Sequence, residues 1–128
     1  MNAQMVFAVA VGGAAGSVGR YLAMSAVGGW LGSGFPWGTL FVNVVGSFAM
    51  GVLVEASAQM WSPSPELRAM LTVGVLGGFT TFSAFSLDVA VLWERHQVAI
   101  AALYAIASVI LSVGALFLGL ALVRQFLR

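Results

Sequence analysis

The chain has 128 residues, of which 61% are hydrophobic and only 7% are charged. Its charged side chains are five arginines and four acids, with no lysine, and it has no cysteine. Soluble domains are about a quarter charged, so this composition excludes a soluble enzyme, a nucleic-acid-binding protein and a disordered chain. Four spans of about 20 residues would use nearly all of the hydrophobic content. We therefore expect an all-α integral membrane protein with four transmembrane helices in a single domain, residues 1–128.

The first helix is expected at about residues 4–27, and its only charged residue is Arg20. Gly12 and Gly16 form a GxxxG pair, which is typical of close packing between membrane helices. We expect that packing to lie within one subunit. An arginine inside a span needs a partner or a water-filled vestibule. Arg20 therefore either binds backbone carbonyls or raises the local concentration of anions.

The second helix is expected at about residues 37–59, after a glycine-rich loop over 28–36. Thr39, Asn43 and Ser47 recur every four residues and so share one face of this helix. Asn43 offers two N–H donors and one carbonyl acceptor. Its role is either an interhelical hydrogen bond or a place in a polar pathway.

The third helix is expected at about residues 66–95, a length of roughly 45 Å at 1.5 Å per residue. That exceeds the hydrocarbon core of about 30 Å. Its middle, Gly77–Ser86, combines paired glycines with threonines, which are poor helix formers. We predict a break here, near the middle of the span. Irregular backbone at this depth is tolerated only inside protein or along a water-filled cavity, where freed carbonyls can coordinate a cation.

Phe82 and Phe85 follow the predicted break and are three residues apart. Core packing is the ordinary role of such a pair. In an ion pathway, the ring edge carries partial positive charge and can contact a small anion without trapping it. The fourth helix is expected at about residues 98–126. It carries a second polar stripe of Tyr104, Ser108 and Ser112.

The arginines are split almost evenly between the two sides of the membrane. Four spans place both termini and the loop between helices two and three on one side, with Arg68, Arg124 and Arg128. The other side has Arg20 and Arg95. An excess of basic residues marks the cytoplasmic side, so an excess of one predicts weak orientation. The chain then either inserts both ways up or takes its orientation from a factor other than its arginines. In the first case, two antiparallel copies would form an inverted repeat.

Three segments carry a resemblance to a known family. They are Gly12–Tyr21 (GGAAGSVGRY), Gly38–Asn43 (GTLFVN) and Gly77–Ser86 (GGFTTFSAFS). In this order, in a four-span chain of this length, they resemble the Fluc (CrcB) fluoride channels over nearly the whole chain. The resemblance implies a passive fluoride-selective channel that exports fluoride across the cell (inner) membrane and so reduces its toxicity.

The resemblance also implies an assembly and a set of site residues. The assembly is an antiparallel dual-topology homodimer in the lipid bilayer, with two fluoride pores. The implied fluoride pathway comprises Asn43, Phe82, Ser83, Phe85, Tyr104 and Ser108, and the implied vestibule residue is Arg20. A structural Na⁺ at the dimer centre would be held by the backbone carbonyls of Gly77 and Thr80 from both subunits. The chain departs from the family pattern at Ala84, often Thr, and at Asp88, often Glu.

Other functions have less support from the sequence. There is no Ser/His/Asp set, phosphate loop or pair of carboxylates at catalytic spacing, so we expect no enzyme activity. A small proton-coupled multidrug antiporter can also be a four-helix dual-topology dimer. It needs a carboxylate in the first span, where this chain has only Arg20. A noncatalytic accessory subunit would not explain two polar stripes beside a broken helix.

Overall fold

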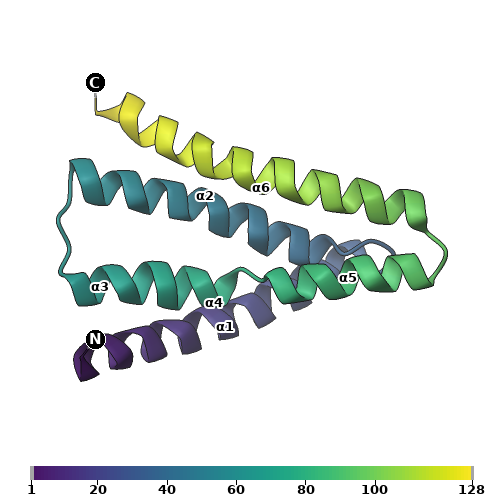
Figure 1. The fold of residues 1–128 in the computed structure, drawn as a ribbon, viewed down its shortest axis with the longest axis horizontal. Helices are drawn as coiled ribbons and strands as arrows, with labels where there is room; N and C mark the ends of the chain where they lie inside the picture. Colours follow the sequence, from purple (N-terminus) through teal and green to yellow (C-terminus); the bar gives the residue numbers. More distant parts are fainter. Residues whose placement is uncertain (1, 128) are drawn as a thin grey trace.

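The computed structural model describes residues 2–127, which fold into helices joined by short connections (Figure 1). Four helical segments are long and apolar enough to cross a membrane: Ala3–Leu31, Trp37–Gln59, Pro65–Glu94 and Val98–Phe126. Both termini lie at the same end as the connection between the second and third segments. The prediction of four spans is therefore confirmed. Arg128, which entered the charge count, lies outside the described residues.

The second and fourth spans begin and end where the sequence predicts. They are α2 (Trp37–Gln59) and α6 (Val98–Phe126). The first helix, α1 (Ala3–Leu31), continues four residues beyond the expected end. It stops at Gly32, whose φ of 85° suits only glycine well. The Gly28–Gly29 pair was wrongly assigned to a loop, because a backbone in an apolar environment satisfies its polar groups best by remaining helical.

The third span is broken, as predicted, but over a shorter stretch. It comprises α3 (Pro65–Ala69), η1 (Met70–Leu76), α4 (Gly77–Phe79) and α5 (Phe82–Glu94). Only Thr80 and Thr81 lie between α4 and α5, and both have extended dihedral angles. The π-helical η1 was not predicted, because seven residues are too few for apolar spacing to distinguish a π-helix from an α-helix.

The first half of the third span lies against α1 (Figure 1), and glycines allow the two backbones to meet. A Cβ on Gly16 would overlap the Val75 carbonyl, and one on Gly78 would come within 2.8 Å of the Gly13 carbonyl. Such approaches are possible only without a Cβ. A Cβ on Gly12 would likewise overlap the Met70 carbonyl, so the predicted packing of Gly12 and Gly16 within one subunit is confirmed.

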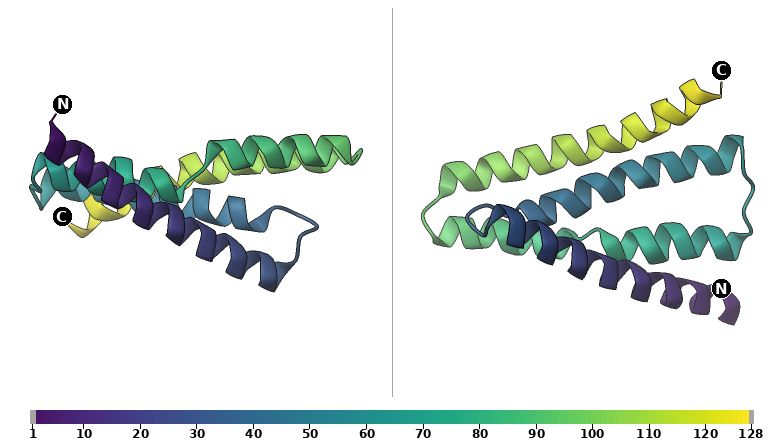
Figure 2. Two further views of the ribbon diagram at one scale, coloured as in Figure 1. Left: turned by 90° about the horizontal axis from the view of Figure 1, so that it is seen from below. Right: turned by 180° about the vertical axis from the view of Figure 1, so that it is seen from behind.

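The second half of the third span, α5, lies beside α6 and diverges from α1 and the start of α2 (Figure 2). Leu92 of α5 packs with Ala101 and Tyr104 of α6 in a buried apolar cluster. Many large apolar side chains elsewhere face outward, including Phe7, Phe82 and Phe117. An exterior of this kind suits lipid or another membrane-embedded surface.

Candidate ion pathway

The break in the third span is held by one side chain of α2. The Asn43 amide nitrogen donates to the Thr81 carbonyl at 3.0 Å, and the Thr81 N–H donates to the Asn43 side-chain oxygen at 2.7 Å. Asn43 thus replaces both hydrogen bonds that a continuous helix would give Thr81. The Thr81 hydroxyl also accepts from the Ala84 N–H at 3.0 Å, which caps the first turn of α5.

The break frees several backbone carbonyls from helical hydrogen bonding, and they have different partners. The Gly78 carbonyl accepts from Arg20 Nε at 2.9 Å, and the Thr81 carbonyl accepts from Asn43. Within residues 2–127, the carbonyls of Gly77 and Thr80 accept no hydrogen bond. The same holds for the Phe79 carbonyl, so three carbonyl oxygens beside the break are available to a ligand.

A groove of about 380 Å³ runs beside the break. Its walls come from α2, α6, the break itself and the first turn of α5. Residues that line it include Asn43, Ser47, Thr80, Thr81, Phe82, Phe85, Ser108 and Ser112. None of the residues that line this groove is charged. Its polar groups are hydroxyls, one amide and backbone, so it can contact an ion without a formal opposite charge.

Two hydroxyls on the α6 wall are available for hydrogen bonding. Ser108 and Ser112 both have buried Oγ atoms that make no hydrogen bond within residues 2–127. Burial of an unpaired hydroxyl is costly, so such groups are typical of a site that receives a ligand or water. Ser112 belongs to the polar stripe noted in the sequence, although the implied pathway did not include it.

Aromatic rings line one side of the groove. The ring centroids of Phe82 and Phe85 are 5.4 Å apart, and those of Phe85 and Tyr104 are 5.3 Å apart. Phe82 is 78% exposed, so this chain alone does not cover that ring. The groove is consequently open on the Phe82 side.

Tyr104 lies at the far end of these rings and is completely buried. Its hydroxyl donates to Asp88 Oδ2 at 2.9 Å, and the Phe35 ring packs edge-on against it at 5.4 Å. Asp88 also lines a second hollow of about 310 Å³, together with Thr39 and Arg95. Tyr104 therefore contacts groups that belong to both hollows.

The structure brings together only some of the residues implied for the pathway. Asn43, Phe82, Phe85 and Ser108 line the groove, whereas Tyr104 does not line it but packs against Phe85. Ser83 does not line it; its hydroxyl lies 3.2 Å from the Thr81 hydroxyl.

Arg20 also lies outside the groove. Its side chain reaches the Gly78 carbonyl from α1, which is the first of the two roles considered for it. A hydrogen bond from Arg20 Nε leaves the rest of the guanidinium free to act on ions, so the vestibule role stays a prediction.

Comparison with known proteins gives one consistent result. The family model of the CrcB-like proteins, described as Camphor Resistance (CrcB), matches residues 7–120. A "Fluoride-specific ion channel FluC" from Rhodospirillum centenum is 61% identical over 94% of this chain and 96% of its own length. Proteins of the same name from Chelativorans sp. and Agrobacterium fabrum are 60% and 54% identical. They cover 93% and 91% of this chain, and 95% and 94% of their own lengths.

Proposed function

This chain belongs to the CrcB-like family, and we propose that it is a passive fluoride-selective channel that exports fluoride and so reduces its toxicity. It is a multi-pass membrane protein and not an enzyme. The observation that carries the proposal is the uncharged groove with unpaired, buried hydroxyls on Ser108 and Ser112. Fluoride is small and strongly hydrated, so it enters a pore only where donors replace its water. Conduction also requires that it leave again, which a fixed positive charge would oppose.

The groups around the groove offer fluoride several kinds of donor. The two serine hydroxyls can donate from α6, and the Asn43 amide has one N–H beyond the hydrogen bond to Thr81. The edges of Phe82 and Phe85 add partial positive charge from the opposite side. Ser83, beside Thr81, and Tyr104, beside Phe85, would act next to this set, and Arg20 would attract anions toward the break.

The active form in this proposal is an antiparallel dual-topology homodimer with two pores in the cell membrane. Three features support it. The arginines are almost evenly split between the two sides, the Phe82 ring is largely exposed, and the groove is open. A second copy would cover the exposed ring and close the pathway against lipid.

The same assembly would hold a structural Na⁺ at its centre. Unwound backbone carbonyls are typical Na⁺ ligands in membrane proteins. The carbonyls of Gly77 and Thr80 accept no hydrogen bond within residues 2–127, and Gly77 is exposed on the surface of this chain. These oxygens fit the group, whose positive charge would neutralise carbonyl dipoles that meet at the interface.

The decisive test is fluoride efflux from liposomes that contain the purified protein, without a proton gradient. We expect passive fluoride flux and far less chloride flux. The absence of fluoride flux, or equal flux of chloride, would contradict the proposal. Flux that appears only with a proton gradient would instead favour an antiporter.

Two further measurements test the assembly. A C-terminal tag should be accessible from both sides of the membrane, and access from one side only would refute dual topology. Reconstitution with Na⁺ replaced by a bulky organic cation should lower flux and dimer content. Unchanged flux and dimer content would argue against the Na⁺ site.

A further inference from the structure

The two long walls of the groove come from α2 and α6. Residues Asn43, Ser47 and Met50 line it from α2, and Ser108, Ser112 and Leu116 line it from α6. The separation of these helices therefore fixes the distance between the Asn43 amide and the serine hydroxyls. Whatever holds α2 against α6 also determines the width of the groove.

The two helices meet backbone to backbone directly beyond the groove, at Gly51 and Gly119. A Cβ on Gly119 would lie 2.5 Å from the Phe48 carbonyl oxygen and 2.9 Å from the Val52 nitrogen. A Cβ on Gly51 would overlap the Leu116 carbonyl, and Leu116 itself lines the groove. These clashes involve backbone, which cannot rotate away as a side chain can. Only glycine at both positions permits this separation.

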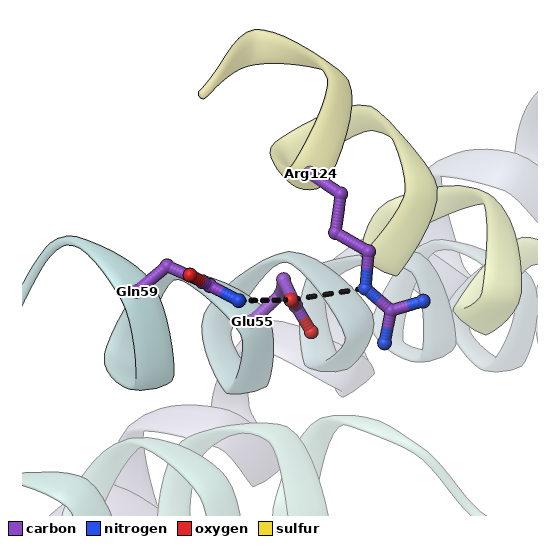
Figure 3. Close-up of polar contacts among 3 residues, drawn as sticks. All are labelled: Glu55, Gln59 and Arg124. Carbon is purple, nitrogen blue, oxygen red and sulfur yellow. Dashed lines mark hydrogen bonds and ion pairs between the residues drawn. The ribbon is translucent and has the colours of Figure 1, made fainter. Parts of the chain in front are cut away.

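An ion pair joins the same two helices about one turn farther along (Figure 3). Arg124 Nε lies 3.0 Å from Glu55 Oε1, which also accepts from Gln59 Nε2 at 3.0 Å. The Glu55 side chain is only 8% exposed, whereas that of Arg124 is 59% exposed. Glu55 is therefore enclosed and held by two donors, and the pair fixes the ends of α2 and α6 together.

We propose that the Gly51–Gly119 contact, closed by the Glu55–Arg124 ion pair, sets the groove width that discriminates fluoride from chloride. These four residues do not touch the ion; they position the groups that do. The inference rests on the proposed fluoride channel. Fluoride is the smaller ion and needs donors close on both sides to replace its water. A wider groove loses that fit and favours the larger, less strongly hydrated chloride, since selectivity depends on pore size and on the number of groups that contact the ion.

The first test compares Gly119→Ala with Gly114→Ala in liposomes. Both glycines are on α6, but a Cβ on Gly114 would meet nothing within 4 Å among residues 2–127. Overpacking of this kind destabilises the close contact of α2 and α6 enough to change the ratio of closely packed to separated helices about tenfold. We therefore expect Gly119→Ala to lower the fluoride-to-chloride flux ratio about tenfold, and Gly114→Ala to keep the wild-type ratio.

The second test does not alter backbone packing. Arg124→Gln removes the ion pair, and Arg68→Gln removes one charge from a residue that makes no ion pair within residues 2–127 and does not line the groove. Loss of a charge changes the attraction for fluoride and chloride alike, so it leaves their ratio unchanged. A lower ratio in Arg124→Gln alone would support positioning of the helices.

The outcomes separate cleanly. Wild-type ratios in both Gly119→Ala and Arg124→Gln would overturn the inference, as would an equal loss in Gly114→Ala. If Gly119→Ala does not fold, the comparison of Arg124→Gln with Arg68→Gln decides. If the wild-type protein carries no fluoride, the proposed function fails first, and that result is seen before any variant is compared.

Discussion

The two halves of the third span use different means of packing, although they belong to one stretch of chain. Before the break, η1 and α4 meet α1 backbone to backbone at glycines such as Gly16 and Gly78. After the break, α5 packs on α6 through side chains, among them Phe85 against Tyr104. The first half has a fixed backbone beside the free carbonyls. The second half presents aromatic rings that are only partly covered. The contrast indicates that the glycines fix the position of the break and the rings form the pathway.

The largest effect is expected where the first half meets α1. Gly16→Val would force a side chain into the Val75 backbone, and overpacking of this kind costs about 3 kcal/mol. We expect most of the folded protein to be lost, as measured by thermal unfolding in detergent and by the yield of dimer. Gly13→Val is the control, because a Cβ at Gly13 would meet nothing within 4 Å in the part of the chain that the structure describes. If both variants destabilise the protein equally, then backbone contact at Gly16 is not what distinguishes the packing of the first half from that of the second.

The next largest effect is expected for substitution of Asn43, which holds the break between the two halves. Asn43→Ala removes both hydrogen bonds to Thr81, each worth about 1 kcal/mol, so we expect a loss of about 2 kcal/mol and a strong reduction in fluoride flux. Asn43→Asp retains the acceptor for the Thr81 N–H and should recover part of the stability but not the flux.

Ser47→Ala is the matched comparison for the stability measurement. Ser47 lies one turn along the same face of α2, and its hydroxyl makes no hydrogen bond to another part of residues 2–127. If Ser47→Ala destabilises the protein as much as Asn43→Ala, then Asn43 does not have the special role of holding the break.

The second half should show a change mainly in flux, with a loss of stability of about 1 kcal/mol or less, smaller than that expected at Gly16 or Asn43. Phe82→Ile and Phe85→Ile keep apolar volume but remove ring edges, whose interactions are worth about 1 kcal/mol. We expect about a tenfold fall in fluoride efflux from liposomes for each variant. Phe117→Ile changes an exposed ring on α6 outside the groove and should have no effect. Full flux in both α5 variants would mean that these rings pack the protein and do not line its pore.

Much of this contrast can be predicted from the sequence. Charge-free runs and the Gly77–Ser86 stretch gave four spans and a broken third helix, because span length and helix propensity are local properties. Spacing of four residues also predicted that Asn43 and Ser108 each belong to a polar face of their helix, since this follows directly from helix geometry. Both residues line the groove, although their roles in conduction stay predictions.

The remaining features depend on tertiary contacts that no local pattern specifies. The hydrogen bonds of Asn43 join residues 38 positions apart, and the Glu55–Arg124 pair joins residues 69 positions apart. The continuation of α1 through Gly28 and Gly29 also contradicts their usual role in loops. The resemblance implies both Ser83 and Ser108 in the pathway, yet the Ser83 hydroxyl is directed to Thr81. Which hydroxyl faces the groove is decided by packing between helices.

The smallest effects are expected at the N-terminal caps of α3 and α5, one in each half of the third span. Ser64 caps α3 by accepting from the Leu67 N–H at 3.2 Å, and Thr81 caps α5 by accepting from the Ala84 N–H at 3.0 Å. Ser64 is exposed and Thr81 is buried. Water can replace the first cap but not the second, so we expect about 0.5 kcal/mol for Ser64→Ala and about 1 kcal/mol or more for Thr81→Val.

Thermal unfolding and fluoride efflux, measured on both variants, test this difference. Ser64→Ala should conduct as the wild type does, because it lies at the end of the span farthest from the break. Thr81→Val should also lower flux, because Thr81 lines the groove. If the two variants lose the same stability and neither loses flux, then loss of the cap at the break has no larger effect than loss of a cap at an ordinary helix start. In that case Asn43 alone would determine the geometry of the break.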